Sequence, residues 1–286
     1  MKDYPAVARA DEITDGRFES GHLWLTEKID GSLLRVQLRE SGLIRVGTAE
    51  AVYDDAEAVP EGYRHAVRHV RERLDRGALR AAVDDVESVV LFGEATQKQR
   101  LEYDWARVPS FLGFDVWSAD GDRGRFLPPD AVERIFERLG LESVPVVERE
   151  LNTRDFDPES YTIPRSAYYD GPAEGVVARN KAGGRAKIVR PEFETVTAPE
   201  PIDASETDVA KRYVDDRRLE RIESALLERG EAITVEAMYE RTLEDVFREK
   251  HRRLFHGGST LDMAAFRAAV AAEIRAYTDR RAIGSE

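Results

Sequence analysis

The chain has 286 residues, with 43 Lys and Arg against 56 Asp and Glu, and a formal net charge of −13 at pH 7. It contains no cysteine, which excludes disulfide frameworks, thiol catalysis and cysteine-ligated zinc. It has neither an apolar run of about 18 residues nor a charged stretch followed by an apolar one at the N-terminus, so we expect a cytoplasmic protein without a membrane span.

The acidic balance argues against a generic binder of phosphate backbones. Only seven of the basic residues are lysines, at positions 2, 28, 98, 181, 187, 211 and 250, so arginine carries most of the positive charge. This composition resembles that of proteins from salt-loving archaea, in which molar salt screens charges over about 3 Å. An ordinary acidic enzyme is the alternative.

The first part of the chain predicts strands around a helical segment. Near-alternation of apolar and polar residues over 22–54 predicts a strand, a turn and a strand, and then, after a break at 40–42, the further strand segment L-I-R-V-G-T-A. Residues 62–83 predict a helix that is opened by Pro60 and interrupted at Gly77.

Further strands are predicted at 88–94 and 109–117, the second closed by a turn at 120–122. A helix is predicted at 129–139, since Pro129 suits a first turn and Gly140 follows its end. All these elements precede residue 140, and the next regular pattern is a hairpin.

Two short strands, A-E-G-V-V-A-R and A-K-I-V-R-P-E-F, flank a turn N-K-A-G-G-R and predict a hairpin over 173–193. The glycine pair does not match a phosphate-binding loop, because no helix follows it. The aperiodic stretch after Phe193 predicts a domain boundary, and amphipathic patterns at 207–228, 233–254 and 260–280 predict an all-helical end.

The segment T-E-K-I-D-G-S carries the first chemical signal. In an extended segment Lys28 and Asp30 share one side, and Gly31 lets the backbone approach a phosphate. A nearby cation or metal would lower the pKa of a buried lysine and make it a nucleophile. By itself this motif is weak, and a surface hairpin with an exposed Lys and Asp is the alternative.

An ordered series of residues strengthens the motif. Glu94 ends L-F-G-E, Phe114 and Asp115 lie in F-L-G-F-D-V-W, Glu174 opens E-G-V-V, and Lys187 lies in A-K-I-V-R-P-E-F. With E-K-x-D-G, this series resembles motifs I, III, IIIa, IV and V of the covalent nucleotidyltransferases, which include DNA ligases, RNA ligases and mRNA capping enzymes. The resemblance covers about residues 20–195.

The resemblance implies the reacting groups. Lys28 would be the adenylylated nucleophile, and Lys187 would neutralise charge on the α-phosphate. Glu174 and Asp30 would help to hold the catalytic metal, Mg²⁺ or Mn²⁺, with the nucleotide phosphates.

The same resemblance implies the nucleotide contacts. Arg45 would contact phosphate at the reacting end, Glu94 would bond the ribose hydroxyls, and Phe114 would stack on the adenine in preference to Phe111. Each has an ordinary alternative as a strand-end carboxylate, a core aromatic or a solvated strand residue.

Two features favour an RNA ligase. Glu27 directly precedes Lys28, as in RNA ligases of the RNA ligase 2 type, where this glutamate faces the adenine amino group and selects ATP. DNA ligases usually carry the glutamate one position earlier, where Thr26 stands here. DNA ligases and capping enzymes also continue into a small β-barrel, whereas this chain continues into helices.

Three observations remain open. Val189 stands where the second lysine of motif V is usual, and Arg185 or Arg190 would have to supply that charge. Asp30 follows the DNA-ligase form of motif I. Basic residues of the helical region predict either a duplex-binding patch or a solvated face with ion pairs; they are Lys211, Arg212, Arg217, Arg218 and Arg221.

The resemblance thus predicts an α+β protein. Residues 1–200 would form a nucleotidyltransferase (ATP-grasp-like ligase) domain of antiparallel sheets and helices, and residues 201–286 a small all-α domain. We expect a monomeric, ATP-dependent RNA ligase of a halophilic archaeon or its virus, sealing 3′-OH and 5′-phosphate ends through lysyl-AMP and RNA-adenylate. Its partners would be RNA ends or nicked duplexes. The alternatives are a DNA nick ligase and a catalytically weak end-binding protein.

Overall fold

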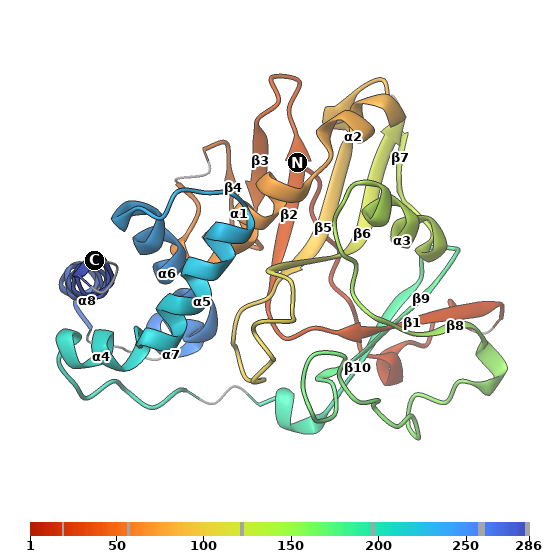
Figure 1. Cartoon of the computed structure of the whole chain (residues 1–286). Coiled ribbons are helices and arrows are strands. Elements are labelled where there is room, and N and C mark those ends of the chain that lie inside the picture. The colour runs from red at the N-terminus through yellow and green to blue at the C-terminus, as the bar shows by residue number, and fades with distance from the viewer. Residues whose placement is uncertain (19, 56–57, 121–122, 196–197, 257–260, 284–286) are drawn as a thin grey trace. The chain divides into compact units, whose positions relative to one another are not determined.

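The computed structural model describes the whole chain except residues 19, 56–57, 121–122, 196–197, 257–260 and 284–286. The chain divides into two compact units, Met1–Val196 and Thr197–Glu286 (Figure 1). The first combines antiparallel sheets with helices and the second is helical where described, which confirms the predicted α+β class. No helix of the described residues is long and apolar enough to cross a membrane.

Among the described residues of the first unit, ten strands form two antiparallel sheets. The four-stranded sheet has the order β10-β9-β1-β8 and the six-stranded sheet the order β4-β3-β2-β5-β6-β7. The strands are β1 His22–Lys28, β2 Ser32–Leu38, β3 Ile44–Gly47, β4 Val52–Tyr53, β5 Val89–Ala95, β6 Phe111–Asp120, β7 Arg123–Phe126, β8 Val146–Asn152, β9 Gly175–Asn180 and β10 Arg185–Val189.

The sequence from β1 to β2 is not a hairpin, although its pattern is strand, turn, strand. β1 pairs with β8 and β9, whereas β2 pairs with β3 and β5 of the other sheet. The chain therefore crosses between sheets directly after Lys28. A Cβ at Gly31 would lie 2.4 Å from the Ala95 carbonyl oxygen, so glycine allows this close crossing.

Short helices cover the six-stranded sheet. The α-helices are α1 Arg64–Arg73, α2 Arg76–Ala82 and α3 Pro129–Arg138, and the 3-10 turns are η1 Ala10–Glu12, η3 Glu61–Tyr63, η4 Val86–Ser88, η5 Thr153–Asp155 and η6 Pro191–Phe193. The helix predicted over 62–83 breaks at Leu74 and Asp75 rather than at Gly77, which lies inside α2. The reason is a cap, because the Asp75 carboxylate accepts a hydrogen bond from Ala78 N at 2.8 Å.

The second unit packs its helices around one apolar core. The helices are α4 Glu206–Tyr213, α5 Asp216–Glu228, α6 Val235–Glu249, α7 His251–Phe255 and α8 Met263–Ile283. The first predicted helix is split in two at Val214, because Asp215 caps α5 by accepting from Arg218 N. The core includes the fully buried Phe266, Val270 and Ile274 of α8.

Candidate nucleotide-binding site

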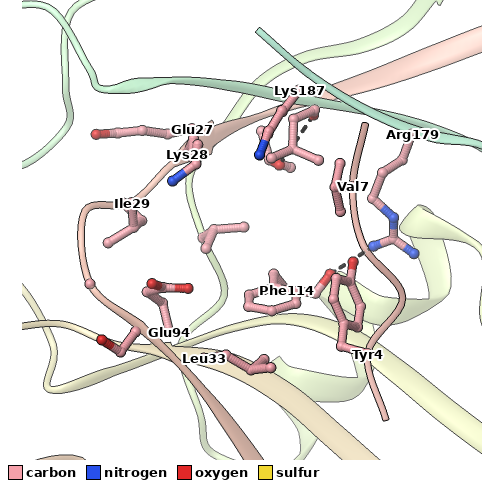
Figure 2. A pocket seen from close by; sticks show the side chains of 15 residues that line it. Tyr4, Val7, Glu27, Lys28, Ile29, Leu33, Glu94, Phe114, Arg179 and Lys187 are labelled. Atoms are coloured by element: carbon pink, nitrogen blue, oxygen red, sulfur yellow. Dashed lines mark hydrogen bonds between the residues drawn. The ribbon is translucent and has the colours of Figure 1, made fainter. Parts of the chain in front are cut away.

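A pocket of about 290 Å³ lies in the first unit, with walls from both sheets (Figure 2). Lys28 and Lys187 come from the four-stranded sheet, and Leu33, Glu94 and Phe114 from the six-stranded sheet. Figure 2 shows the ammonium groups at one end and the Phe114 ring at the other. The pocket therefore offers a charged end and an apolar end, which suits a nucleotide.

Strand register explains how distant lysines meet. Thr26 lies opposite Val177, and Val177 lies opposite Lys187, so these side chains share one face of the sheet. Lys28 lies opposite Gly175 in the next row, and that row ends at Val189. Two lysines 159 positions apart thus project into one pocket.

Lys28 Nζ forms an ion pair with Glu174 Oε1 at 2.7 Å. Burial alone would lower the pKa of Lys28, but Glu174, Glu94 and Asp30 together outweigh it and raise that pKa above its ordinary value. The sequence predicts a lowered pKa for Lys28, because a cation or metal is expected near the lysine. As described, the pocket holds Lys28 protonated.

Carboxylates exceed cations around Lys28. Burial raises the pKa of Glu94 to about 8; Lys28 opposes this shift, and the Glu174 and Asp30 charges add to it. Burial likewise raises the pKa of Glu174, whose second oxygen Oε2 is buried and has no hydrogen-bond partner in the described structure. A buried acceptor without a donor is costly, so this oxygen is poised for a ligand.

Phe114 reaches the pocket through a β-bulge. Phe92 of β5 pairs with Asp115, and Gly93 pairs with Gly113, so Phe114 is the extra residue on β6. Its half-buried ring lines the pocket. Phe111 is instead fully buried in the core, with its ring centroid 6.3 Å from that of Phe136.

Behind Phe114 lies a buried ionic cluster that the sequence does not single out as a site. Asp115 is fully buried and pairs with Arg179 Nη2 at 2.8 Å and Arg185 Nη2 at 2.6 Å. Arg179 also lines the pocket and donates from Nη1 to the Phe114 carbonyl at 2.7 Å. Arg179 stands two positions after Val177 on β9, and this spacing, which places both side chains on one face, is the only sequence signal that the arginine faces the pocket.

Two predicted residues make other contacts in the structure. Oδ2 of Asp30 accepts from the backbone N–H groups of Arg100 and Leu101, both at 2.6 Å, and so anchors the loop after β5. Glu27 borders the pocket, but its carboxylate points away from the centre (Figure 2) and accepts from Ser166 Oγ at 2.5 Å and Ala167 N at 2.9 Å. In this state neither carboxylate is directed at a pocket ligand.

Arg45 is not among the residues that line the pocket. It lies on β3, and its Nε bonds Asp54 Oδ1 at 2.5 Å. Neither arginine proposed for the charge missing at Val189 borders the pocket: Arg185 bonds Asp115, and Arg190 pairs with Glu192 at 2.8 Å.

The basic patch predicted in the helical unit is incomplete. Arg218 is buried and bonds Asp245 and Glu249 of α6, and Arg221 bonds the same two acids. Arg218 thus stabilises helix packing from a buried position, whereas Lys211, Arg212, Arg217 and the ion-paired Arg221 are exposed.

Among the described residues, no group of three or more His, Asp or Glu side chains is arranged to hold a metal by itself. A Mg²⁺ site that uses one or two carboxylates and completes its sphere with water and phosphate remains compatible with this finding. Glu174 Oε2, which has no hydrogen-bond partner among the described residues, is a carboxylate oxygen of the kind that such a site uses.

The model of the RNA ligase family matches residues 21–189, more than half of the chain, and includes every pocket residue named above. The chain belongs to the RNA ligase family. A comparison with curated proteins gives no match.

Solved structures show the same fold. A variant of Naegleria gruberi RNA ligase with ATP and Mn is similar at a TM-score of 0.51 and 16% identity, over 67% of this chain and 57% of that one. A ligand-free variant of that enzyme gives a TM-score of 0.50 and 17% identity, over 67% of this chain and 56% of that one. The chain thus spans less than two thirds of these proteins.

Proposed function

We propose that the protein is an ATP-dependent RNA ligase that forms a covalent lysyl-adenylate on Lys28. The observation that carries this proposal is the Lys28 ammonium, held 2.7 Å from Glu174 in a pocket of a chain that belongs to the RNA ligase family. The Naegleria enzyme that shares the fold is described with ATP and Mn, which supports nucleotide and metal use here.

In the first step, Lys28 Nζ attacks the α-phosphorus of ATP, a phosphoramide bond forms, and pyrophosphate leaves. The ammonium must first lose a proton, and Glu174 Oε1 is placed to accept it. Burial raises the pKa of Glu174, which makes it a better base than a solvated carboxylate. Lys187 lies on the same sheet face and would stabilise the phosphate charge.

Two further steps complete sealing. The 5′-phosphate of an RNA end displaces Lys28 from AMP to give RNA-adenylate, and a 3′-hydroxyl then attacks the 5′-phosphate and releases AMP. We assign Phe114 to stacking on adenine and Glu94 to the ribose hydroxyls, since both border the pocket. Glu27 would reach the base only by exchanging its bonds to Ser166 and Ala167.

The pocket fits a divalent metal. The surplus of carboxylates and the unpaired Glu174 Oε2 favour a bound cation. A bound Mg²⁺ or Mn²⁺ would screen nucleotide phosphates and lower the pKa of Lys28 by adding positive charge. Glu174 would hold it through water or directly, and Asp30 has only Oδ1 available, since Oδ2 bonds two backbone amides.

The acidic surface is consistent with a halophilic source, and we propose a monomeric enzyme working in the cytoplasm on RNA ends or nicks. Asp30 does not favour the DNA-ligase alternative, because its observed role is to anchor a loop. Val189 supports the alternative of a catalytically weak end-binding protein. Lys28 and Val189 both lie opposite Gly175, so an apolar residue occupies the position where the second lysine of motif V is usual.

Incubation with ATP labelled at the α-phosphate, in magnesium and in both low and molar salt, tests the first step. We expect label on the wild type and on Lys181→Ala, whose lysine is exposed and paired with Glu150, but none on Lys28→Ala. An unlabelled wild type, or a labelled Lys28→Ala, would refute the proposal.

The adenylylated enzyme can then be offered nicked RNA, nicked DNA and hybrid duplexes. Sealing should be fastest on RNA. Equal sealing of an all-DNA nick would favour the DNA-ligase alternative, and transfer to none would favour the end-binding alternative.

A further inference from the structure

The first nine residues, here called the N-terminal strap, attach to both sheets. At one end Lys187 N donates to the Ala8 carbonyl at 2.9 Å, and Arg9 forms a parallel bridge with Lys187 on edge strand β10. At the other end the Tyr4 ring packs on Phe92 of the six-stranded sheet, with 5.1 Å between centroids. The strap therefore joins the two walls of the pocket.

Between these attachments the strap borders the pocket itself. Val7 and Tyr4 are both among the lining residues, and Figure 2 shows the strap running along the apolar end, opposite Glu94 and Lys28. The Tyr4 ring meets Phe114 edge to face, with 5.1 Å between centroids and 69° between planes. This end of the pocket has the flat apolar surfaces that suit a base.

Tyr4 also bonds the ionic cluster that holds the Phe114 backbone in place. Its hydroxyl donates to Asp115 Oδ2 at 3.1 Å, and Asp115 holds Arg179, whose Nη1 bonds the Phe114 carbonyl. The bulged Phe114 backbone lacks a partner on β5, so its position depends on these bonds and on ring packing.

We propose that the N-terminal strap forms part of the nucleotide-binding site and contributes to nucleotide affinity. Val7 contacts the base, and Tyr4 is a positioning residue that holds Phe114 in its stacking orientation. This inference rests on the proposed function, and it assigns Tyr4 and Val7 of the strap a part in binding the nucleoside, distinct from the binding of phosphate by the Lys28 and Lys187 ammonium groups.

The separation of the two ends makes the proposal testable with two probes. AMP carries a base but no leaving group, so it binds without reacting, whereas inorganic tripolyphosphate reports only on the phosphate end. Calorimetric titration of each probe compares wild type with Tyr4→Ala, Tyr4→Phe and Val7→Ala. Lys2→Ala is the matched control, because Lys2 belongs to the strap but lies over Trp117, 4.5 Å from the ring centroid.

We expect Tyr4→Ala to weaken AMP binding about 10-fold, with smaller losses of about 2- to 5-fold for Tyr4→Phe and Val7→Ala. Tripolyphosphate binding should stay within about twofold in all variants, and Lys2→Ala should match wild type for both probes. Tyr4→Phe keeps the ring, so it remains informative if Tyr4→Ala does not fold.

Unchanged AMP affinity in Tyr4→Ala and Val7→Ala would overturn the proposal. Equal loss of AMP and tripolyphosphate affinity would also overturn it, because it would show a general disruption of the pocket. A wild type that binds neither probe would instead contradict the proposed function of the site, before the strap comes into question.

Discussion

Both units bury charge, but they balance it differently. In the helical unit the buried Arg218 bonds Glu249 Oε2 through Nη2 at 2.6 Å, and the exposed Arg221 adds bonds from Nη2 to Asp245 Oδ2 at 2.7 Å and Glu249 Oε1 at 3.2 Å. In the pocket Lys28 faces three carboxylates, which raise its pKa, while the pKa of Glu94 is raised to about 8.

This difference in charge balance distinguishes a cluster that stabilises the fold from one that binds a ligand. A buried ion pair with mutual hydrogen bonds offsets its desolvation cost and adds no new binding capacity. Surplus charge of one sign lacks this compensation and is tolerated where a ligand of opposite sign binds. The pocket, with an unpaired Glu174 Oε2, is of the second kind. Substitutions in the two clusters should therefore act on different properties.

The largest effect should come from Lys28→Arg. A guanidinium keeps the positive charge opposite Glu174, but it does not deprotonate and cannot attack phosphorus. We expect single-turnover labelling to fall by about 10⁴-fold or more, while urea unfolding changes by less than about 1 kcal/mol. Residual labelling near the wild-type rate would mean that another residue is the nucleophile.

In the helical unit the same kind of change should affect stability. Arg218→Met leaves Asp245 and Glu249 with less compensation, so we expect unfolding of this unit to lose about 3–5 kcal/mol. Arg212→Met, at an exposed position of α4, should change it by less than about 0.5 kcal/mol. Urea titration followed by circular dichroism measures both. A loss below about 1 kcal/mol for Arg218→Met would remove the contrast between the clusters.

The sequence predicts the strands, helices and motif residues of the two units better than it predicts the contacts between them. The series from Lys28 to Lys187 marks residues on paired strands and beside them, and strand pairing brings them together through the period of two. The helical end is predicted for a similar local reason, since its 3.6-residue pattern lies within each helix.

Contacts between distant segments carry no such signal. Glu27 meets Ser166 across 139 positions, and Asp30 meets Arg100 across 70, so their partners depend on loop paths. Strand β8 is also absent from the sequence prediction, and four of its seven residues are exposed, which weakens its apolar pattern. Tyr4 lies outside the recognised motifs, and only the folded strap places it beside Phe114.

Glu94→Gln separates a structural role of this carboxyl group from a role in binding. With a pKa of about 8, Glu94 is largely protonated at pH 7, so glutamine imitates its resting form and unfolding should change by less than about 1 kcal/mol. Glutamine cannot ionise when a nucleotide binds, so the ribose hydroxyls lose the stronger acceptor, and kcat/KM for adenylylation should fall by about 10- to 100-fold. Stopped-time labelling over a range of ATP concentrations measures this. A strongly destabilised Glu94→Gln would show that the carboxylate is structural.

The smallest effect concerns pH and the helical unit. His251 is buried, and burial together with His256, whose Nε2 lies 3.2 Å from its own, lowers the pKa of His251 to about 3. Between pH 6.5 and about pH 3, His251 is protonated in the unfolded chain, whose His pKa is about 6.5, but neutral in the folded chain. Stability is therefore full above pH 6.5 and falls below it, by about 1.4 kcal/mol per pH unit. We expect urea unfolding to lose this amount between pH 7.5 and 5.5 in wild type, and a flatter profile in His251→Gln. If the stability of the two proteins changed with pH in the same way, the folded helical unit would tolerate a protonated His251, and its contrast with the pocket would be lost.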